Sequence, residues 1–283
     1  MIFPNPYSQE PIDSYLEISF DQFQLMGRSI AGVETVISIP QWNINFDTGR
    51  VPSFAFVQDY VALSHWHLDH AGGLATYLAL RCLNSLSILH ILVPEEKYKE
   101  AEEYLTLLKK ISDSQLDYSL MSAKKPVVIR KDLQVRAIQT FHCTPSAAYL
   151  VEQKRQKLVS QFQDKSQSEI IKAKSQGVEV AKEVVEPLLA FSGDTKGEFL
   201  TTEATRARYL LMECSFFGED VDYEAIRYYG HTHIKDWKKY AENIQSETVV
   251  MIHTSQRYTK KEIEKACVKY LPKNLLDRLI VFR

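Results

Sequence analysis

The chain has 283 residues, of which 45% are hydrophobic and 25% charged, and this composition is typical of a soluble globular protein with a buried core. Its 34 Lys and Arg residues nearly balance 36 Asp and Glu residues, so the net charge of −2 excludes a globally basic chain and requires a local patch for any nucleic-acid contact. No apolar run has the length of a membrane span, and residues 1–11 lack the basic and apolar regions of a signal peptide.

Short apolar runs typical of β-strands alternate along the chain with segments of helical spacing. The strand-like runs lie at 61–64, 87–93, 127–129, 133–141, 147–151, 188–192, 209–215, 248–252 and 279–282. The helix-like segments lie at 72–83, 96–111, 222–244 and 259–271. This alternation predicts an α/β protein with layered sheets and helices outside them. The polar, Lys-rich stretch 152–186 predicts a surface excursion from one domain, 1–283, rather than a domain boundary.

The sequence HWHLDH, residues 65–70, places three histidines and one aspartate directly after a strand-like run. Neutral imidazole and carboxylate groups are suitable ligands for zinc. His65 and His67 alternate in an extended segment and can point to the same side, whereas Asp69 and His70 fall at the turn into the next helix. Two pairs of ligands that face neighbouring positions suggest a site for two metal ions.

Four candidate ligands each follow a strand-like run directly. They are His65, His142, Asp194 and His253. In a layered α/β sheet, functional groups gather at the carboxyl ends of the strands. We therefore expect these four side chains to meet at one edge of the sheets.

With these motifs the chain resembles the metallo-β-lactamase superfamily and, within it, ribonuclease Z, the endonuclease that processes the 3′ end of tRNA. FDTGRVP (46–52) is similar to the family's first motif, and FSGDT contains Asp194. ECSF (213–216), YGHTHI (229–234) and IHTSQRY (252–258) narrow the resemblance to the short form of the plant nuclear type. The resemblance runs from about residue 46 to the end. It implies an αββα sandwich, in which two mixed β-sheets face each other and helices flank them.

The resemblance also implies a cofactor of two Zn²⁺ ions per chain. One zinc would be held by His65, His67 and His142, the other by Asp69, His70 and His253, with Asp194 bridging both. A hydroxide between the metals would attack the phosphodiester, because zinc lowers the pKa of its bound water to about 7. The implied partners are precursor tRNA and a second copy of the chain in a homodimer, and the implied location is cytoplasmic, or nuclear in a eukaryote.

Three residues match catalytic positions of the family. His231 would protonate the leaving 3′-oxygen, Glu213 would orient His231, and Asp69 could accept a proton as well as ligate metal. Ser146, with Thr144, is a candidate for hydrogen bonding to phosphate. Arg257 and Tyr258 could contact the substrate or support the C-terminal metal loop, and both interpretations stay open.

The chain also departs from the family pattern. Met212 stands where the family has a histidine, and residues 152–186 show no Gly/Pro-rich exosite segment. Six basic residues of this stretch could contact tRNA phosphates: Lys154, Arg155, Lys157, Lys165, Lys172 and Lys174. A solvated charged helix is an equally good interpretation, because acidic residues are interspersed.

Several other residues are expected to have structural roles. His90 is expected to pack within a strand and His233 to act structurally or behind the site. The four cysteines form no C-x-x-C pair, so we expect reduced, mostly buried thiols, including Cys143 beside His142. Two alternatives to an RNA endonuclease remain: another hydrolase of the same fold that acts on a small phosphodiester or thioester, and a binding module without activity. Because all seven ligand positions are filled, the sequence favours an enzyme.

Overall fold

The structure is a computed structural model that describes residues 15–283, so the expectation about a signal peptide concerns residues outside the described part. The described residues build two sheets. The first sheet consists of β1 (Leu16–Ser19), β2 (Gln24–Ala31), β3 (Glu34–Ile39), β4 (Ile44–Phe46), β5 (Tyr60–Ala62), β6 (Leu89–Val93) and β7 (Tyr118–Ser122) in this order, with β14 (Thr254–Ser255) beside β2. It is antiparallel from β1 to β4 and parallel from β4 to β7.

The second sheet contains the remaining strands. In spatial order they are β15 (Leu279–Val281), β13 (Thr248–Ile252), β12 (Tyr209–Glu213), β11 (Ala181–Phe191), β10 (Ala147–Leu158), β9 (Leu133–Gln139) and β8 (Val127–Arg130). Strands β15 to β11 are parallel and β11 to β8 are antiparallel. Both sheets are therefore mixed, as the resemblance implied.

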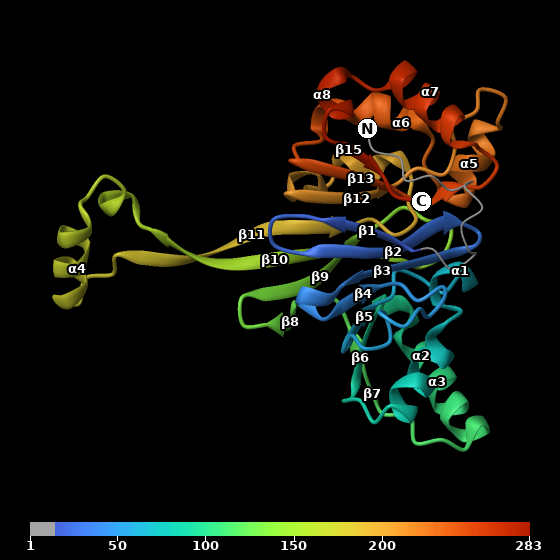
Figure 1. Ribbon diagram of the computed structural model, residues 1–283, viewed down its shortest axis with the longest axis horizontal. Helices are drawn as coiled ribbons and strands as arrows, with labels where there is room; N and C mark the ends of the chain where they lie inside the picture. Colours follow the sequence, from blue (N-terminus) through green and yellow to red (C-terminus); the bar gives the residue numbers. More distant parts are fainter. Residues whose placement is uncertain (1–14) are drawn as a thin grey trace.

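Helices flank the two sheets on their outer faces (Figure 1). They are α1 (Leu68–Ala71), α2 (Leu74–Leu83), α3 (Tyr98–Ser112), α5 (Tyr223–Tyr229), α6 (Ile234–Tyr240), α7 (Lys260–Tyr270) and α8 (Lys273–Leu276). A further helix, α4 (Gln167–Ser175), lies away from the sheets. One apolar cluster joins α2 and α3 to the first sheet, and another joins α6 and α7 to the second. A third cluster fills the space between the sheets, where the rings of Phe46 and Phe191 stack with centroids 5.0 Å apart. The layers are thus helix, sheet, sheet, helix.

All nine predicted strand runs lie on observed strands, but β1 to β4, β7 and β14 were not predicted. In β2 buried Leu25, Gly27 and Ser29 alternate with half-buried residues, and β4 has only three residues, so neither forms a long apolar run. The predicted helix 222–244 was wrong as one element, because it is split into α5 and α6. Gly230 ends α5 with a φ of +77°, a left-handed conformation that favours glycine and turns the chain.

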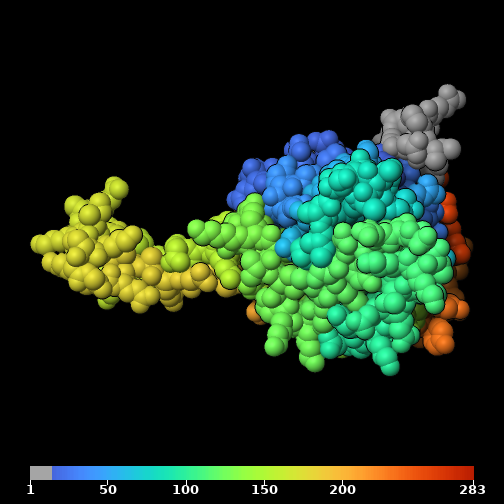
Figure 2. Space-filling view, turned by 90° about the horizontal axis from the view of Figure 1, so that it is seen from below, coloured from blue at the N-terminus to red at the C-terminus, as the bar shows by residue number. Residues whose placement is uncertain are grey.

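Residues 152–186 form a projecting arm. Strands β10 and β11 pair as an antiparallel ribbon out to Leu158 and Ala181, and α4 lies at its tip, away from the body (Figure 1). Figure 2 shows the arm standing free of the body. The burial of β10 ends near Val151, where a register shift also occurs, so the arm begins where core packing stops. The solvated-helix interpretation therefore describes α4 alone, whereas 152–158 and 181–186 form the β-ribbon, and a short 3-10 helix (Ser160–Phe162) and loops complete the tip.

Candidate metal centre

The predicted convergence at the strand ends is present. His65 follows β5, His142 follows β9, Asp194 follows β11 and His253 follows β13. Their ligand atoms join those of neighbouring residues in three overlapping groups, within each of which all atoms lie within 4.8 Å of one another. The groups are His65, His67, His142 and Asp194; Asp69, His70 and His253; and Asp194, His231 and His253. Each could hold a metal ion, and they share Asp194 and His253.

The first group is open to solvent on one side. Nε2 of His65 lies 3.0 Å from Nδ1 of His67, and Nε2 of His142 lies 3.4 Å from that same Nδ1. His65 and Asp194 are buried, whereas His142 is half-buried and His67 is exposed. A substrate can therefore approach this group from the side of His67.

The second group is more deeply buried. Nε2 of His70 lies 3.2 Å from Nε2 of His253, and Oδ2 of Asp69 lies 3.6 Å from the first nitrogen and 3.5 Å from the second. Asp194 reaches both groups, since its Oδ2 is 3.7 Å from His65 Nε2 and 3.4 Å from His70 Nε2. The carboxylate of Asp194 thus lies where a bridging ligand would lie.

Two features of this cluster fit bound cations. Oδ1 of Asp194 is buried and has no hydrogen-bond partner among residues 15–283, although a buried carboxylate oxygen normally needs one. The facing Nε2 atoms of His70 and His253 carry lone pairs that need a proton or a cation between them. A donor set of imidazoles and carboxylates is also the set that zinc accepts.

The protonation states of the first group agree with metal binding, whereas in the second group the charges of Asp194 and Asp47 outweigh burial and raise the pKa of His70 well above its ordinary value. Burial lowers the pKa of His65 well below its ordinary value, and it lowers the pKa of His67 and His142 as well. Burial by itself would raise the pKa of Asp194, but the neighbouring histidines hold that pKa well below its usual range. Neutral imidazoles and an ionised carboxylate are the forms that ligate metal.

Asp47 orients His70 and was not singled out from the sequence. Its Oδ2 lies 2.7 Å from Nδ1 of His70 and accepts from Oγ of Ser64 at 2.8 Å, while its Oδ1 accepts from the Ser64 N–H at 2.7 Å. This contact turns Nε2 of His70 toward the cluster, as carboxylates behind metal-binding histidines do. The signal was present in FDTGRVP, which contains Asp47.

Two further orienting contacts were also missed. The carbonyl of Gly230 lies 3.0 Å from Nδ1 of His142, so Nε2 of His142 faces the cluster. A Cβ on Gly230 would lie 2.6 Å from the Cα of His142, which requires glycine there. Oγ of Ser215 lies 3.0 Å from Nδ1 of His253 and donates to Oε2 of Glu213 at 2.8 Å.

His231 lies in the turn between α5 and α6, beside the cluster. Its Nδ1 is 3.2 Å from Oε1 of Glu213 and 3.9 Å from Oδ2 of Asp194. Burial alone would lower the pKa of His231, but the hydrogen bond and charge of Glu213 outweigh this and raise the pKa to about 9. The backbone N–H groups of Thr195 and Thr232 also donate to Glu213 Oε1, at 3.1 and 3.2 Å, and fix the carboxylate.

Met212 does not face the cluster. It precedes Glu213 on β12 and is fully buried in the apolar cluster beneath α6 and α7. Because successive strand residues point to opposite faces, its side chain and that of Glu213 lie on opposite sides of the sheet. The replacement of the family's histidine by methionine therefore changes a core position and leaves the Glu213–His231 contact in place.

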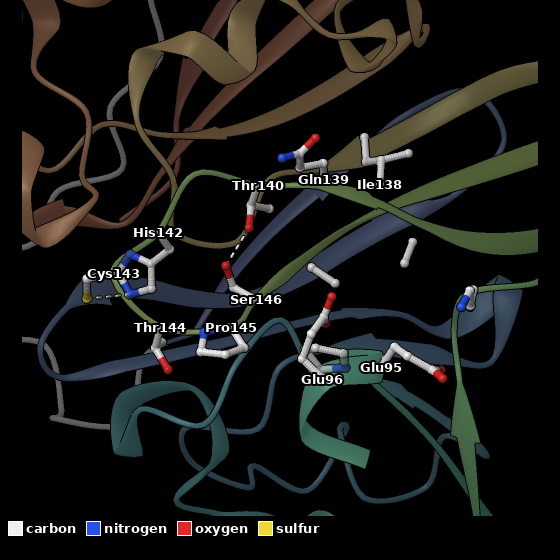
Figure 3. Close-up of a pocket in the computed structure, with 14 residues that line it drawn as sticks. Glu95, Glu96, Ile138, Gln139, Thr140, His142, Cys143, Thr144, Pro145 and Ser146 are labelled. Atoms are coloured by element: carbon white, nitrogen blue, oxygen red, sulfur yellow. Dashed lines mark hydrogen bonds between the residues drawn. The ribbon is translucent and has the colours of Figure 1, made fainter. Parts of the chain in front are cut away.

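Two cavities flank the cluster and meet at Cys143. The first, of about 680 Å³, is lined by residues 142–146 at one end and by Glu95 and Glu96 near the other, and Oγ of Ser146 bonds Oγ1 of Thr140 there (Figure 3). The second, of about 520 Å³, is lined by His67, His231 and Arg257 among others. Tyr258 lines neither, and its ring packs against Phe217 with centroids 5.4 Å apart.

The remaining histidines lie away from the cluster, as expected. The ring of His90 stacks on that of Tyr60 with centroids 4.8 Å apart. His233 caps the start of α6, where Nδ1 accepts from the Lys235 N–H at 3.0 Å, and Nε2 contacts the carbonyl of Gly218 at 2.8 Å.

The expectation that Cys143 is buried was wrong, since it is exposed in the turn after β9, with Sγ 3.7 Å from Nε2 of His142. Cys82 is also exposed, so two of the four free thiols are buried.

The chain is similar in sequence or in structure to several known proteins. No protein-family model matches the chain. It is 37% identical over 268 residues to tRNase Z TRZ1 of Arabidopsis thaliana, which covers 93% of this chain and 95% of that protein. The short form of human tRNase Z superposes with a TM-score of 0.56 at 15% identity over 82% of this chain and 92% of that one. The metallo-β-lactamase-fold protein YhfI of Bacillus subtilis superposes with a TM-score of 0.56 at 13% identity, over 90% and 93%. The two superpositions confirm the predicted fold.

Proposed function

The chain belongs to the tRNase Z family, and from this membership we propose that it is a metal-dependent endoribonuclease that removes the 3′ trailer from precursor tRNA. The observation that carries the proposal is the Glu213–His231 pair, which lies beside a cluster of metal-ligating side chains. A cluster that only binds metal does not need an imidazole held next to it by a buried carboxylate. Cleavage of a phosphodiester does, because an alkoxide leaves poorly unless it is protonated.

We propose two zinc ions as the cofactor. The first would be held by His65, His67 and His142, the second by Asp69, His70 and His253, and Asp194 would ligate both. When bound, zinc supplies positive charge to the phosphoryl oxygens and lowers the pKa of water. The short distances between nitrogen atoms support this assignment, as does Oδ1 of Asp194, which lies 3.3 Å from His253 Nδ1 but accepts no hydrogen bond from the described residues.

The chain's own residues supply the proton transfers. Because Nδ1 of His231 is directed to Glu213, Nε2 stays available to donate a proton to the leaving 3′-oxygen. Oδ2 of Asp69 accepts from the Gly32 N–H at 2.8 Å, and the same carboxylate can take a proton from the attacking water. Ser146 and Arg257 line the two cavities that flank the cluster and would contact phosphates, while Tyr258 would support the loop that carries Arg257.

The wider assignments follow from the same proposal. Residues 1–283 would act as one domain with the arm as an extension, and a second copy would complete a homodimer. The location would be cytoplasmic, or nuclear in a eukaryote. In the described part of the chain no helix is long and apolar enough to cross a membrane.

A direct assay tests the proposal. We expect the purified zinc-loaded protein to cut a precursor tRNA once, at the 3′ end of the acceptor stem, and to leave a 3′-hydroxyl there. Bis(p-nitrophenyl) phosphate and S-lactoylglutathione serve as comparison substrates. If the thioester is hydrolysed and the precursor stays intact, a different hydrolase activity is indicated. No turnover of any of the three would favour a binding module.

The arm makes a second expectation testable. Lys172 and Lys174 are exposed on α4, at the tip of the arm, where they can reach tRNA phosphates far from the cleavage site. Changing both to alanine should raise KM for precursor tRNA several-fold and reduce the slope of log KM against log salt by about one for each phosphate that a lysine no longer neutralises. Changing the exposed Lys109 and Lys110 on α3 is the matched control. An equal response in the two double variants would argue that the arm does not bind tRNA.

A further inference from the structure

The cavity of about 520 Å³ beside His231 has features that the proposed cleavage chemistry does not use. One wall is α5, which contributes Ala225, Ile226 and Tyr229. Phe216 and Val221 add further apolar surface. Tyr229 is 58% exposed although its ring is large and apolar. A hollow with apolar walls and an exposed aromatic ring is suited to a flat, uncharged group.

The charged residues that line this cavity determine which part of an RNA can enter it. Asp220 and Asp222 line it, and their carboxylates repel a phosphate. Arg257 is the only Lys or Arg among the described residues that line it. A nucleobase carries no charge, and its edge can donate hydrogen bonds to a carboxylate. The lining therefore favours a base inside the cavity, with the phosphate kept near Arg257 and the metal ligands.

The position of His231 indicates which nucleotide of the RNA supplies this base. His231 lines the same cavity and lies two residues after Tyr229. In the proposed reaction His231 protonates the 3′-oxygen that leaves, and that oxygen belongs to the nucleotide on the 5′ side of the cleaved bond. The base of this nucleotide is therefore the one nearest to Tyr229. Gly230 holds the turn between them, since its left-handed φ of +77° ends α5 and directs the chain back to His231.

We propose that this cavity receives the base of the last nucleotide of the mature tRNA, stacked on the ring of Tyr229. The inference rests on the proposed function and adds a specificity-determining residue to it. Base stacking on an aromatic side chain tolerates all four bases, because every base has a π-face. The pocket would thus position the cleaved bond without reading the identity of the nucleotide.

The test combines a change in the protein with a change in the RNA. Tyr229→Ala should lower kcat/KM for precursor tRNA by about 10-fold, the usual scale for removal of one base stack. Tyr229→Phe keeps the ring and should stay close to wild type. A precursor with an abasic site at the last mature nucleotide should cost the wild-type enzyme a similar factor. It should cost Tyr229→Ala little more, since the stacking interaction is already absent.

Controls separate this inference from the proposed function. Tyr228→Ala is the matched variant, because Tyr228 is 76% exposed on the same helix and does not line the cavity. Its ring packs edge-to-face on that of Tyr229 with centroids 5.3 Å apart, so this variant removes a neighbour of the stacking ring but not the ring itself and should cost much less than Tyr229→Ala. An abasic site at the first trailer nucleotide should have little effect. If the effects of Tyr229→Ala and the abasic site multiply, or if the trailer position is the sensitive one, the base pocket is wrong while the endonuclease stands. If the wild-type enzyme leaves every precursor intact, both proposals fail.

Discussion

Asp194→Ala is expected to remove most of both zinc ions and to slow phosphodiester cleavage by about 10³-fold, the upper scale for loss of one electrostatic stabiliser. The reason is the position of this single carboxylate. Its oxygens lie 3.7 Å from His65 Nε2, 3.4 Å from His70 Nε2 and 3.3 Å from His253 Nδ1, so one side chain serves both groups of ligands. Its removal also takes away the carboxylate that offsets the charge of bound cations in both groups, and leaves Asp69, which serves the second group alone.

His142→Ala is the matched control for this prediction. His142 belongs to the first group and is absent from the second, so its loss should affect mainly one zinc. Zinc per chain, measured by elemental analysis of both variants after dialysis at the same pH, decides the question. A thermal melt of each variant shows whether the fold is retained. Loss of one zinc in each variant, to the same extent, would contradict the bridging role of Asp194.

The convergence of the ligands could be predicted from the sequence for a simple physical reason. His65, His142, Asp194 and His253 each follow a strand-like run, and the carboxyl ends of strands that run in the same direction meet at one edge whatever the exact order of those strands. The order itself could not be read in this way. Strand β14 pairs with β2, for example, and this joins the loop after His253 to the N-terminal part of the first sheet.

The residues that hold the ligands in place were harder to predict. Asp47 and the carbonyl of Gly230 act on histidines that lie 23 and 88 positions away in the chain. Such contacts depend on tertiary structure, and a carbonyl leaves no mark in composition or spacing. Asp47 lies in FDTGRVP, which resembles the family's first motif, so the sequence does contain a pattern that points to this residue.

The arm and the split helix show where local patterns mislead. In 152–186 the charged residues form no apolar run, so the outer parts of two long strands were not predicted. Exposed strands in a ribbon need no apolar face. In 222–244 the helical spacing was right on both sides of a break at residues 230–233, which begins with the left-handed Gly230 and ends with the extended His233 before α6. The break has a functional consequence. It places His231 in a turn beside the cluster. On a continuous helix the direction of the His231 side chain would instead be set by its position on that helix.

His231→Ala is expected to slow precursor cleavage by about 10²- to 10⁴-fold, the usual effect of removing a positioned general acid. The loss should appear in kcat, because the proton moves only in the transition state. It should be much smaller for bis(p-nitrophenyl) phosphate, whose phenolate leaves without protonation. Zinc content is a necessary measurement, because His231 also lies in a group of three possible ligands with Asp194 and His253. Zinc near the wild-type level would support the acid, and loss of one ion would support a ligand.

Glu213→Gln gives the matching pH test. The hydrogen bond and charge of Glu213 raise the pKa of His231 to about 9, so the imidazole is protonated at neutral pH and activity falls as pH rises through that pKa. Without the carboxylate the pKa of His231 falls, and the alkaline limb of kcat should move to lower pH. Bound cations lower the same pKa in both enzymes, so the direction of the difference is unchanged. Rates on the precursor and on the phenolate substrate are measured across pH for wild type and both variants. If His231→Ala slows the two substrates equally, and the alkaline limb stays in place in Glu213→Gln, His231 is not the acid.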